Sequence, residues 1–200
     1  MKDKRPFFPL QLTVHLFAWL PLVWLVWAFW QDRLGFNPVR ALTLRTGKTA
    51  LVLLLLSLAV TPVYLLTGWK GVYRVRRPLG LYAFMYATIH FLIFVGLDYG
   101  FDLALVGEAL RTNRFTYFGL TSFLLLLPLA LTSSRGAAAW LGQKRWRQLH
   151  RLSYLAAALA IVHFALLVRQ YYVQPIIFGS ILAVLLGLRA LFTLFKRQRA

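Results

Sequence analysis

Six long apolar runs constrain this chain more than any other feature of its sequence. A helix needs about 20 mostly apolar residues to cross a hydrocarbon core of about 30 Å, and helices satisfy their own backbone polar groups there. The composition agrees, because 60% of the residues are hydrophobic and only 14% are charged, against about 25% charged in soluble domains. The sequence therefore predicts a single-domain, all-α integral membrane protein over residues 1–200, a bundle of six transmembrane helices. The runs are residues 7–30, 49–69, 79–97, 115–131, 149–168 and 175–195.

Prolines and polar stretches divide these runs. The first run is too long for a signal-peptide core and lacks a small-residue cleavage pattern, so it is expected to be retained. Pro21 is expected to break it locally, and Pro62 to kink the second run. The expected connections are a polar connector that can hold a short surface helix, two basic loops, an acid-bearing loop and a turn, at residues 31–48, 70–78, 132–147, 98–114 and 169–174.

The charges predict the topology. The chain has 23 Lys and Arg against 5 Asp and Glu, but the basic residues lie between apolar runs rather than on one polar surface. This pattern favours lipid headgroups and the positive-inside rule over nucleic acid as a partner. Both termini are predicted to be cytoplasmic, because most basic residues then face the cytoplasm. The opposite side keeps four of the five acids, Asp32, Asp98, Asp102 and Glu108.

Two histidines within the apolar runs are the strongest functional candidates. An intramembrane imidazole is costly without a partner and is by default a functional candidate. At 1.5 Å per residue, His90 lies about 16 Å into the third span and His163 about 21 Å into the fifth, so they stand at similar depth. Two imidazoles at one level on facing helices can bind a haem iron from both sides. The chain has no cysteine, so iron–sulfur clusters and covalent haem attachment are excluded.

The other two histidines have simpler interpretations. His15 lies about 12 Å into the first span, and a single hydrogen bond within the membrane accounts for it. His150 lies at the start of the fifth run, among Arg147, Gln148 and Arg151. A role at the lipid headgroups and a role in binding a cofactor both remain open for it.

Three stretches carry a family resemblance: RRPLGLYAFMYATIHF at residues 76–91, KRWRQLHRLSYLAAALAIVHF at 144–164 and TGKTAL at 46–51. They resemble the haem-binding membrane subunit of bacterial periplasmic methionine-sulfoxide reductase systems, the MsrQ or YedZ family, within the wider ferric reductase-like transmembrane group. The resemblance extends over nearly the whole chain. It implies a b-type haem, an FMN and a place in the bacterial inner membrane. It also implies electron delivery from the quinone pool or a cytosolic flavin reductase to a periplasmic molybdopterin-containing reductase, which repairs oxidised methionines.

The resemblance also bears on how many haems the chain binds. The wider group commonly holds two haems between the third and fifth spans, with two histidines on each, whereas here the third span has only His90. On a straight helix His150 and His163 would point about 140° apart. One haem is therefore expected and two remain open, with His150 serving a second haem or an inner cofactor. The candidate contacts for a flavin or quinone near the inner surface are Arg76, Arg77 and Trp146.

Two other classes of function are open at this stage. A small transporter or proton channel could use His15, His90 and His163 as a relay, but the apolar runs hold no carboxylate and show no inverted repeat. A structural scaffold for a periplasmic enzyme would leave the intramembrane histidines unexplained. The sequence has no Gly-x-Gly-x-x-Gly or P-loop motif, so we expect a non-catalytic electron-transfer subunit without its own nicotinamide-binding domain.

Overall fold

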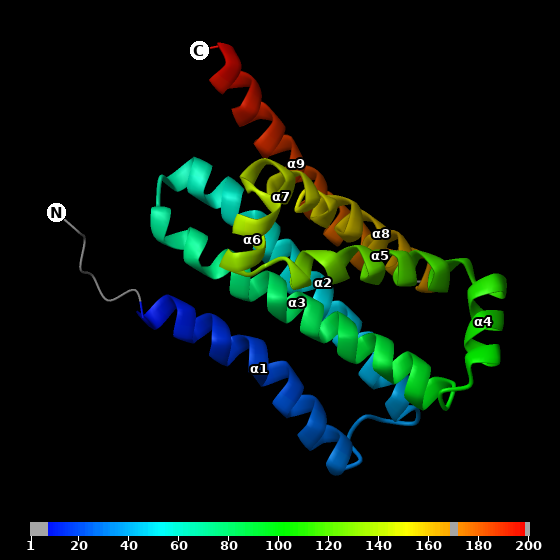
Figure 1. Ribbon diagram of the computed structural model, residues 1–200. Coiled ribbons are helices and arrows are strands. Elements are labelled where there is room, and N and C mark those ends of the chain that lie inside the picture. The colour runs from blue at the N-terminus through cyan, green and yellow to red at the C-terminus, as the bar shows by residue number, and fades with distance from the viewer. Residues whose placement is uncertain (1–7, 169–171, 199–200) are drawn as a thin grey trace.

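The computed structural model describes residues 8–168 and 172–198, and these are helical with short connections and no strand (Figure 1). Residues 1–7, the first half of the expected turn at 169–174 and the last two residues lie outside the described residues. Six helical stretches are long and apolar enough to cross a membrane, so the prediction of an all-α protein with six candidate spans is confirmed. They are Leu10–Trp30, Pro38–Thr67, Lys70–Asp98, Arg114–Leu131, Gln143–Leu167 and Val173–Phe195.

Helix α1 (Phe8–Trp30) continues through Pro21, so the predicted local break is wrong. A helix can absorb the one backbone bond that a proline removes when neighbouring helices support it. Helix α3 (Tyr73–Ile93) contacts this part of α1, since the hydroxyl of Tyr86 donates to the carbonyl of Ala18, 2.7 Å away. Pro62 lies inside helix α2 (Pro38–Thr67), which continues past it.

Helix α2 (Pro38–Thr67) begins well before the predicted start at residue 49. The side chain of Asn37 accepts the backbone N–H of Arg40 at 2.8 Å, and Pro38 occupies the first turn, where its missing N–H costs nothing. The helix ends at Gly68, which adopts the left-handed φ of 69°. Most of the predicted polar connector is therefore part of a spanning helix.

Helices also replace the three predicted loops. The side chains of Asp102 and Ser134 accept backbone N–H groups and cap two of these helices. Helix α4 crosses one end of the bundle, and α6 and α7 lie at the other (Figure 1). We refer to these as the α4 end and the α7 end. The elements are η1 (Lys70–Val72), α3 (Tyr73–Ile93), the π-helical turn η2 (Phe94–Asp98), α4 (Leu103–Thr112), α6 (Arg135–Leu141) and α7 (Gln143–Leu149).

The remaining helices are α5 (Arg114–Leu131), α8 (Leu152–Leu167) and α9 (Val173–Gln198). Helix α5 matches the predicted span closely. Helix α8 starts later than the predicted residue 149, which leaves His150 and Arg151 in a break between α7 and α8. The angle of about 140° between His150 and His163 assumed one straight helix, so it does not apply.

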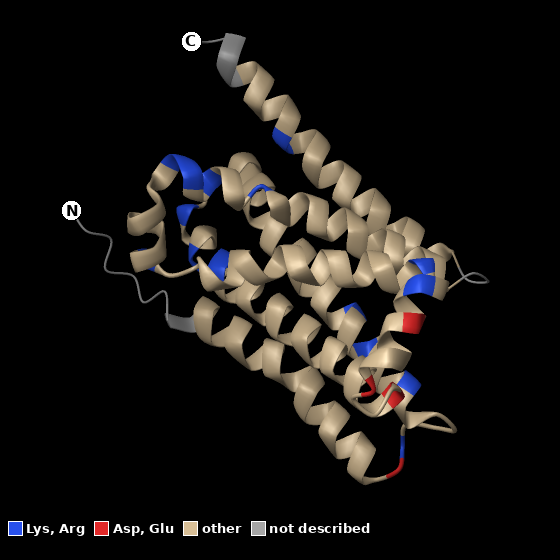
Figure 2. Ribbon diagram, turned by 45° about the vertical axis from the view of Figure 1, so that its right-hand side comes forward, with Lys and Arg blue, Asp and Glu red and all other residues tan. Residues whose placement is uncertain are grey.

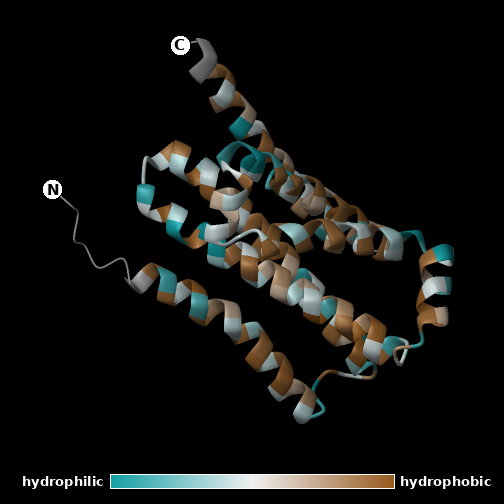
Figure 3. Ribbon diagram, viewed as in Figure 1, coloured by the Kyte–Doolittle hydropathy of each residue, from teal (hydrophilic) through white to brown (hydrophobic). Residues whose placement is uncertain are grey.

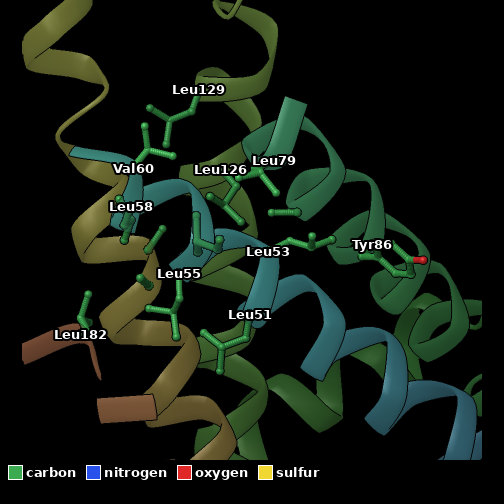
Figure 4. Packing of buried hydrophobic residues seen from close by; sticks show 14 of the residues in the cluster. Leu51, Leu53, Leu55, Leu58, Val60, Leu79, Tyr86, Leu126, Leu129 and Leu182 are labelled. Carbon is green, nitrogen blue, oxygen red and sulfur yellow. The ribbon is translucent and has the colours of Figure 1, made fainter. Parts of the chain in front are cut away.

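The core lies where α2 packs on α3 and α5 packs on α8, the two most extensive helix pairs. Leucines of α2 meet Leu79 and Leu126 there (Figure 4). Ala156 and Ala157 are fully buried, and such small residues let membrane helices approach closely. Apolar side chains also cover outward faces, as on α1 and α9 (Figure 3), which suits a lipid environment.

Charge distinguishes the two ends of the bundle (Figure 2). The α7 end carries Lys and Arg from η1, α3, α6 and α7. The α4 end carries the four acids of the described residues together with several basic residues, and its acids are Asp32, Asp98, Asp102 and Glu108.

Candidate functional site

The imidazole rings of His90 and His163 meet between α3 and α8. Their ring centres are 6.0 Å apart and their planes cross at 83°. His90 lies in the last turn of α3, and His163 lies near the end of α8, so the pair is close to the α4 end. Both side chains are partly buried. The structure thus brings together the two histidines that the sequence selected.

Each ring is held by a backbone carbonyl of another helix. Nδ1 of His90 lies 2.9 Å from the carbonyl oxygen of Thr43 in α2, and Nδ1 of His163 lies 2.6 Å from that of Phe115 in α5. A carbonyl oxygen can only accept, so each Nδ1 donates its hydrogen. In a neutral imidazole this leaves Nε2 with a lone pair. Metal-binding histidines usually have this arrangement, which fixes the tautomer and raises the basicity of the ligating nitrogen.

The spacing of the rings can be tested against a shared metal ion. A bond from a metal to an imidazole nitrogen is about 2 Å long, so two rings on opposite sides of one ion stand about 6 Å apart between their centres. The observed 6.0 Å fits this separation. Two axial histidines leave the other positions of an iron to a porphyrin, as in cytochromes. The donor set therefore fits a haem bound by two histidines.

Aromatic side chains line the helices around the pair. The ring of Phe115 lies 6.0 Å from that of His163. Between α3 and α5, Phe123 stacks on Phe91 at 4.9 Å and on Phe84 at 5.7 Å. Apolar surroundings of this kind limit access of water to a metal site and affect its potential.

His15 is not part of the pair. Its Nδ1 lies 2.8 Å from the hydroxyl of Tyr82, and the two rings meet edge to face at 5.6 Å. A single hydrogen bond accounts for this histidine, as predicted. The proposed relay of three histidines gains no support, because His15 bonds a tyrosine of α3 rather than His90.

His150 lies at the α7 end, close to Trp146. The two rings stack at 4.0 Å, Nδ1 of His150 lies 3.1 Å from the carbonyl of Trp146, and the indole N–H donates to the carbonyl of Thr132 at 2.8 Å. All four histidines are within the described residues, and no other histidine ring contacts that of His150. The structure therefore offers no second pair of histidines like the first.

Arg76 acts on His150, and two further arginines belong to the same charged region. The positive charge of Arg76 acts on His150, and the charges of Arg76 and Arg151 both act on Arg189 of α9. The guanidinium of Arg189 lies 5.0 Å from the ring centre of Tyr154. Arg76 and Arg189 are partly buried, whereas Arg77 is exposed. Arg76, Trp146 and His150 thus lie in one region of the structure, and Arg77 lies on the surface.

The sequence analysis did not identify three groups that lie near these histidines: one arginine and two backbone carbonyls. Arg189 could have been noticed as an isolated cation within the sixth apolar run. The carbonyls of Thr43 and Phe115 have no sequence signature, because every residue carries one. The carbonyl of Thr43 was also hidden by the late predicted start of the second span.

Comparison with known proteins shows which family the chain belongs to. Residues 46–161 match the family described as ferric reductase like transmembrane component. The chain is also 41% identical over 188 residues to a protein of Rhodospirillum rubrum, an alignment that covers 94% of this chain and 90% of that relative. The relative is named protein-methionine-sulfoxide reductase heme-binding subunit MsrQ. This chain belongs to the MsrQ family.

Two further MsrQ relatives support the assignment. One from Xanthomonas axonopodis pv. citri is 43% identical over 194 residues, covering 92% of this chain and 87% of the relative. One from Caulobacter vibrioides is 36% identical over 189 residues, covering 92% and 90%. The family resemblance noted from the sequence is confirmed.

Proposed function

We propose that this chain is the membrane electron-transfer subunit of a methionine-sulfoxide reductase system, with His90 and His163 as the axial ligands of one b-type haem. The observation that carries the proposal is the pair of rings 6.0 Å apart, each with Nδ1 on a carbonyl of another helix. The printed names of the MsrQ relatives, which describe heme-binding subunits, support it.

The chain's own residues define what such a haem does. When bound, the haem supplies one-electron chemistry between ferric and ferrous iron. His90 and His163 hold it from α3 and α8 without a covalent bond. A haem held by both histidines would serve electron transfer rather than binding of oxygen or substrate, because the two imidazoles would occupy its iron. The chain is then a non-catalytic subunit, and its single domain of residues 1–200 serves this one task.

A second carrier is needed at the α7 end, because the histidine pair lies close to the α4 end. We propose that FMN or a quinone binds there beside His150, Trp146 and Arg76. Partly buried guanidinium groups suit the phosphate of FMN, and the described acids all lie at the opposite end. Arg77, which is exposed, is a weaker candidate for this contact.

The orientation follows from the charges. We propose that the α7 end and both termini face the cytoplasm of a bacterial inner membrane, because basic connectors are retained on that side. The donor is then a cytosolic flavin reductase or the quinone pool. The α4 end faces the periplasm, where α4 offers a surface to the molybdopterin-containing catalytic subunit that repairs methionine sulfoxide.

Absorption spectra of the purified protein from haem-replete cells test the proposal. We expect the reduced bands of a b-type haem in the wild type, loss of most haem in His90→Ala and in His163→Ala, and about one haem per chain in His150→Ala. His15→Ala is the matched control, since its hydrogen bond to Tyr82 lies outside the pair. Full haem content in His90→Ala or His163→Ala contradicts the proposed ligands, and a colourless wild type contradicts the haem.

A further inference from the structure

We propose that Gly47 and Gly119 are positioning residues, which set the planes of the two haem ligands by leaving each imidazole room against the backbone of a neighbouring helix. This inference rests on the proposed function, because it assumes that the two histidines bind a haem. The contacts that support it are contacts between protein residues. They involve α2 with His90 of α3, and α5 with His163 of α8.

A side chain at either glycine would collide with a histidine. A Cβ atom built on Gly47 would lie 2.9 Å from Nδ1 and 3.0 Å from Cε1 of His90. A Cβ built on Gly119 would lie 2.7 Å from Nδ1 and 2.8 Å from Cε1 of His163. These separations are shorter than ordinary van der Waals contact, so an alanine at either position must displace the ring or the helix.

The same spacing occurs in both helix pairs. The carbonyl that accepts the bond from His90 belongs to Thr43, and the one that accepts from His163 belongs to Phe115. In each case the glycine follows four residues later, where an α-helix places the N–H that bonds the same carbonyl. The imidazole thus reaches the carbonyl across the space that a side chain on the next turn would fill.

Recurrence argues for a role of these glycines in holding the rings. Glycine inside a helix is less favourable than alanine, so each position has a cost that some other interaction must offset. Other glycines of the described spans behave differently, since a Cβ on Gly187 would meet open space and one on Gly96 would meet the ring of Phe101. Of these four glycines, Gly47 and Gly119 are the ones whose added Cβ would contact a histidine.

The consequence for the site is a fixed orientation. The carbonyl bond sets the rotation of each ring, and the bare helix surface lets the ring take that rotation, so the two planes cross at 83°. The angle between axial imidazole planes determines the splitting of the iron d orbitals, and perpendicular planes give ferric haem an electron paramagnetic resonance spectrum with a large g anisotropy. Pushing a ring off its carbonyl also weakens the nitrogen that binds the metal.

Four single variants test the inference in the purified holoprotein. They are Gly47→Ala and Gly119→Ala, with Gly187→Ala as the control in open space and Gly96→Ala as the control for a clash without histidine. We expect haem affinity to fall about 10-fold or more in the first two, and the haem that remains to show a changed largest g value. Both controls should keep the wild-type spectrum, even if Gly96→Ala unfolds at lower temperature.

A second comparison separates positioning from loss of folding. Gly47→Ala should lower the unfolding temperature in a protein with His90, but not in the His90→Ala background, where the colliding ring is gone. In the His163→Ala background, Gly47→Ala should still lower the unfolding temperature, because the ring of His90 is present there. Equal effects of Gly47→Ala in all three backgrounds contradict the contact whether or not haem is bound.

The outcomes distinguish this inference from the proposed function. Wild-type haem content and wild-type resonance spectra in both Gly47→Ala and Gly119→Ala overturn the inference and leave the haem ligands standing. A wild type without haem overturns the proposed function, and the unfolding comparison then still tests the contact of Gly47 with His90.

Discussion

The two ends of the bundle each hold histidine, but they hold it in different ways. At the α4 end, His90 and His163 bond carbonyls of neighbouring helices, so the fold of four helices fixes the two rings relative to each other. At the α7 end, His150 bonds the carbonyl of Trp146 in its own preceding turn and stacks on its ring. An imidazole tied to another helix is suited to share a ligand with a distant partner. His150 bonds its own preceding turn and also meets the backbone carbonyl of Leu129 in α5, but no second histidine ring faces it within the described residues.

The surroundings of the two ends also differ, since one is apolar and the other is charged. Phe115 packs against His163 of the pair, and a stack of phenylalanines lies between α3 and α5. At the other end, Arg76 acts on His150, and Arg76 and Arg151 act on Arg189. Neutral nitrogen ligands in an apolar setting suit a haem iron. Guanidinium groups beside aromatic rings suit a planar ligand with an anionic group. The comparison therefore fits the proposed haem ligands at one end and the proposed anion-binding site at the other.

Among the variants that test the difference between the two ends, the largest effect is expected for substitution of the arginines at the α7 end. Arg76→Gln and Arg189→Gln should each lower the affinity for FMN about 10-fold, because a charge-assisted hydrogen bond contributes about 1.5–3 kcal/mol. Haem content should stay unchanged, since the histidine pair lies near the other end. Fluorescence titration of FMN with the purified protein measures the affinity. Arg77→Gln is the matched control, because Arg77 is exposed. A loss of haem with retention of FMN would reverse the roles assigned to the two ends.

A smaller effect is expected from a bond that belongs to neither end. Tyr86 is fully buried, and its hydroxyl donates to Ala18 at 2.7 Å. Tyr86→Phe should therefore lower the free energy of unfolding by about 1 kcal/mol, seen as a drop of about 2–4 °C in the unfolding temperature. Haem and FMN contents should both remain at the wild-type level. If either cofactor is lost while the protein stays folded, the two sites depend on α1 and are not local to their ends.

The fold could be predicted from the sequence where a sequence pattern is compatible with only one structure. Long apolar runs have few alternatives in lipid, and histidines at matched depth on two of them pointed to the pair that the structure brings together. The family likeness rested on the same stretches and was confirmed by the relatives.

The start of α2 shows where the pattern failed. Arg40, Arg45 and Lys48 made residues 38–48 look like part of a polar connector with at most a short surface helix, yet this stretch is the first part of the spanning helix α2. The guanidinium of Arg45 lies 4.4 Å from the ring centre of Trp24 in α1, and such a contact with an aromatic face stabilises a cation at the edge of an apolar region. The cap by Asn37 then lets the helix begin early.

The parts of the site that could not be predicted depend on contacts between helices. The carbonyls of Thr43 and Phe115 become acceptors only because α2 packs on α3 and α5 on α8. Gly47 and Gly119 gain their meaning from the same packing. The break at His150 was missed because residues 143–167 are continuous in hydropathy, and hydropathy does not report backbone turns.

Exchange of one axial ligand tests the central claim most directly. Near-infrared magnetic circular dichroism of the ferric haem distinguishes two imidazole ligands from one imidazole and one thioether, and a methionine ligand also raises the haem potential. The account predicts the two-imidazole band in the wild type, and its replacement by the thioether band or loss of haem in both His90→Met and His163→Met. An unchanged two-imidazole band at full haem content in either variant would contradict the assignment of that histidine to the iron.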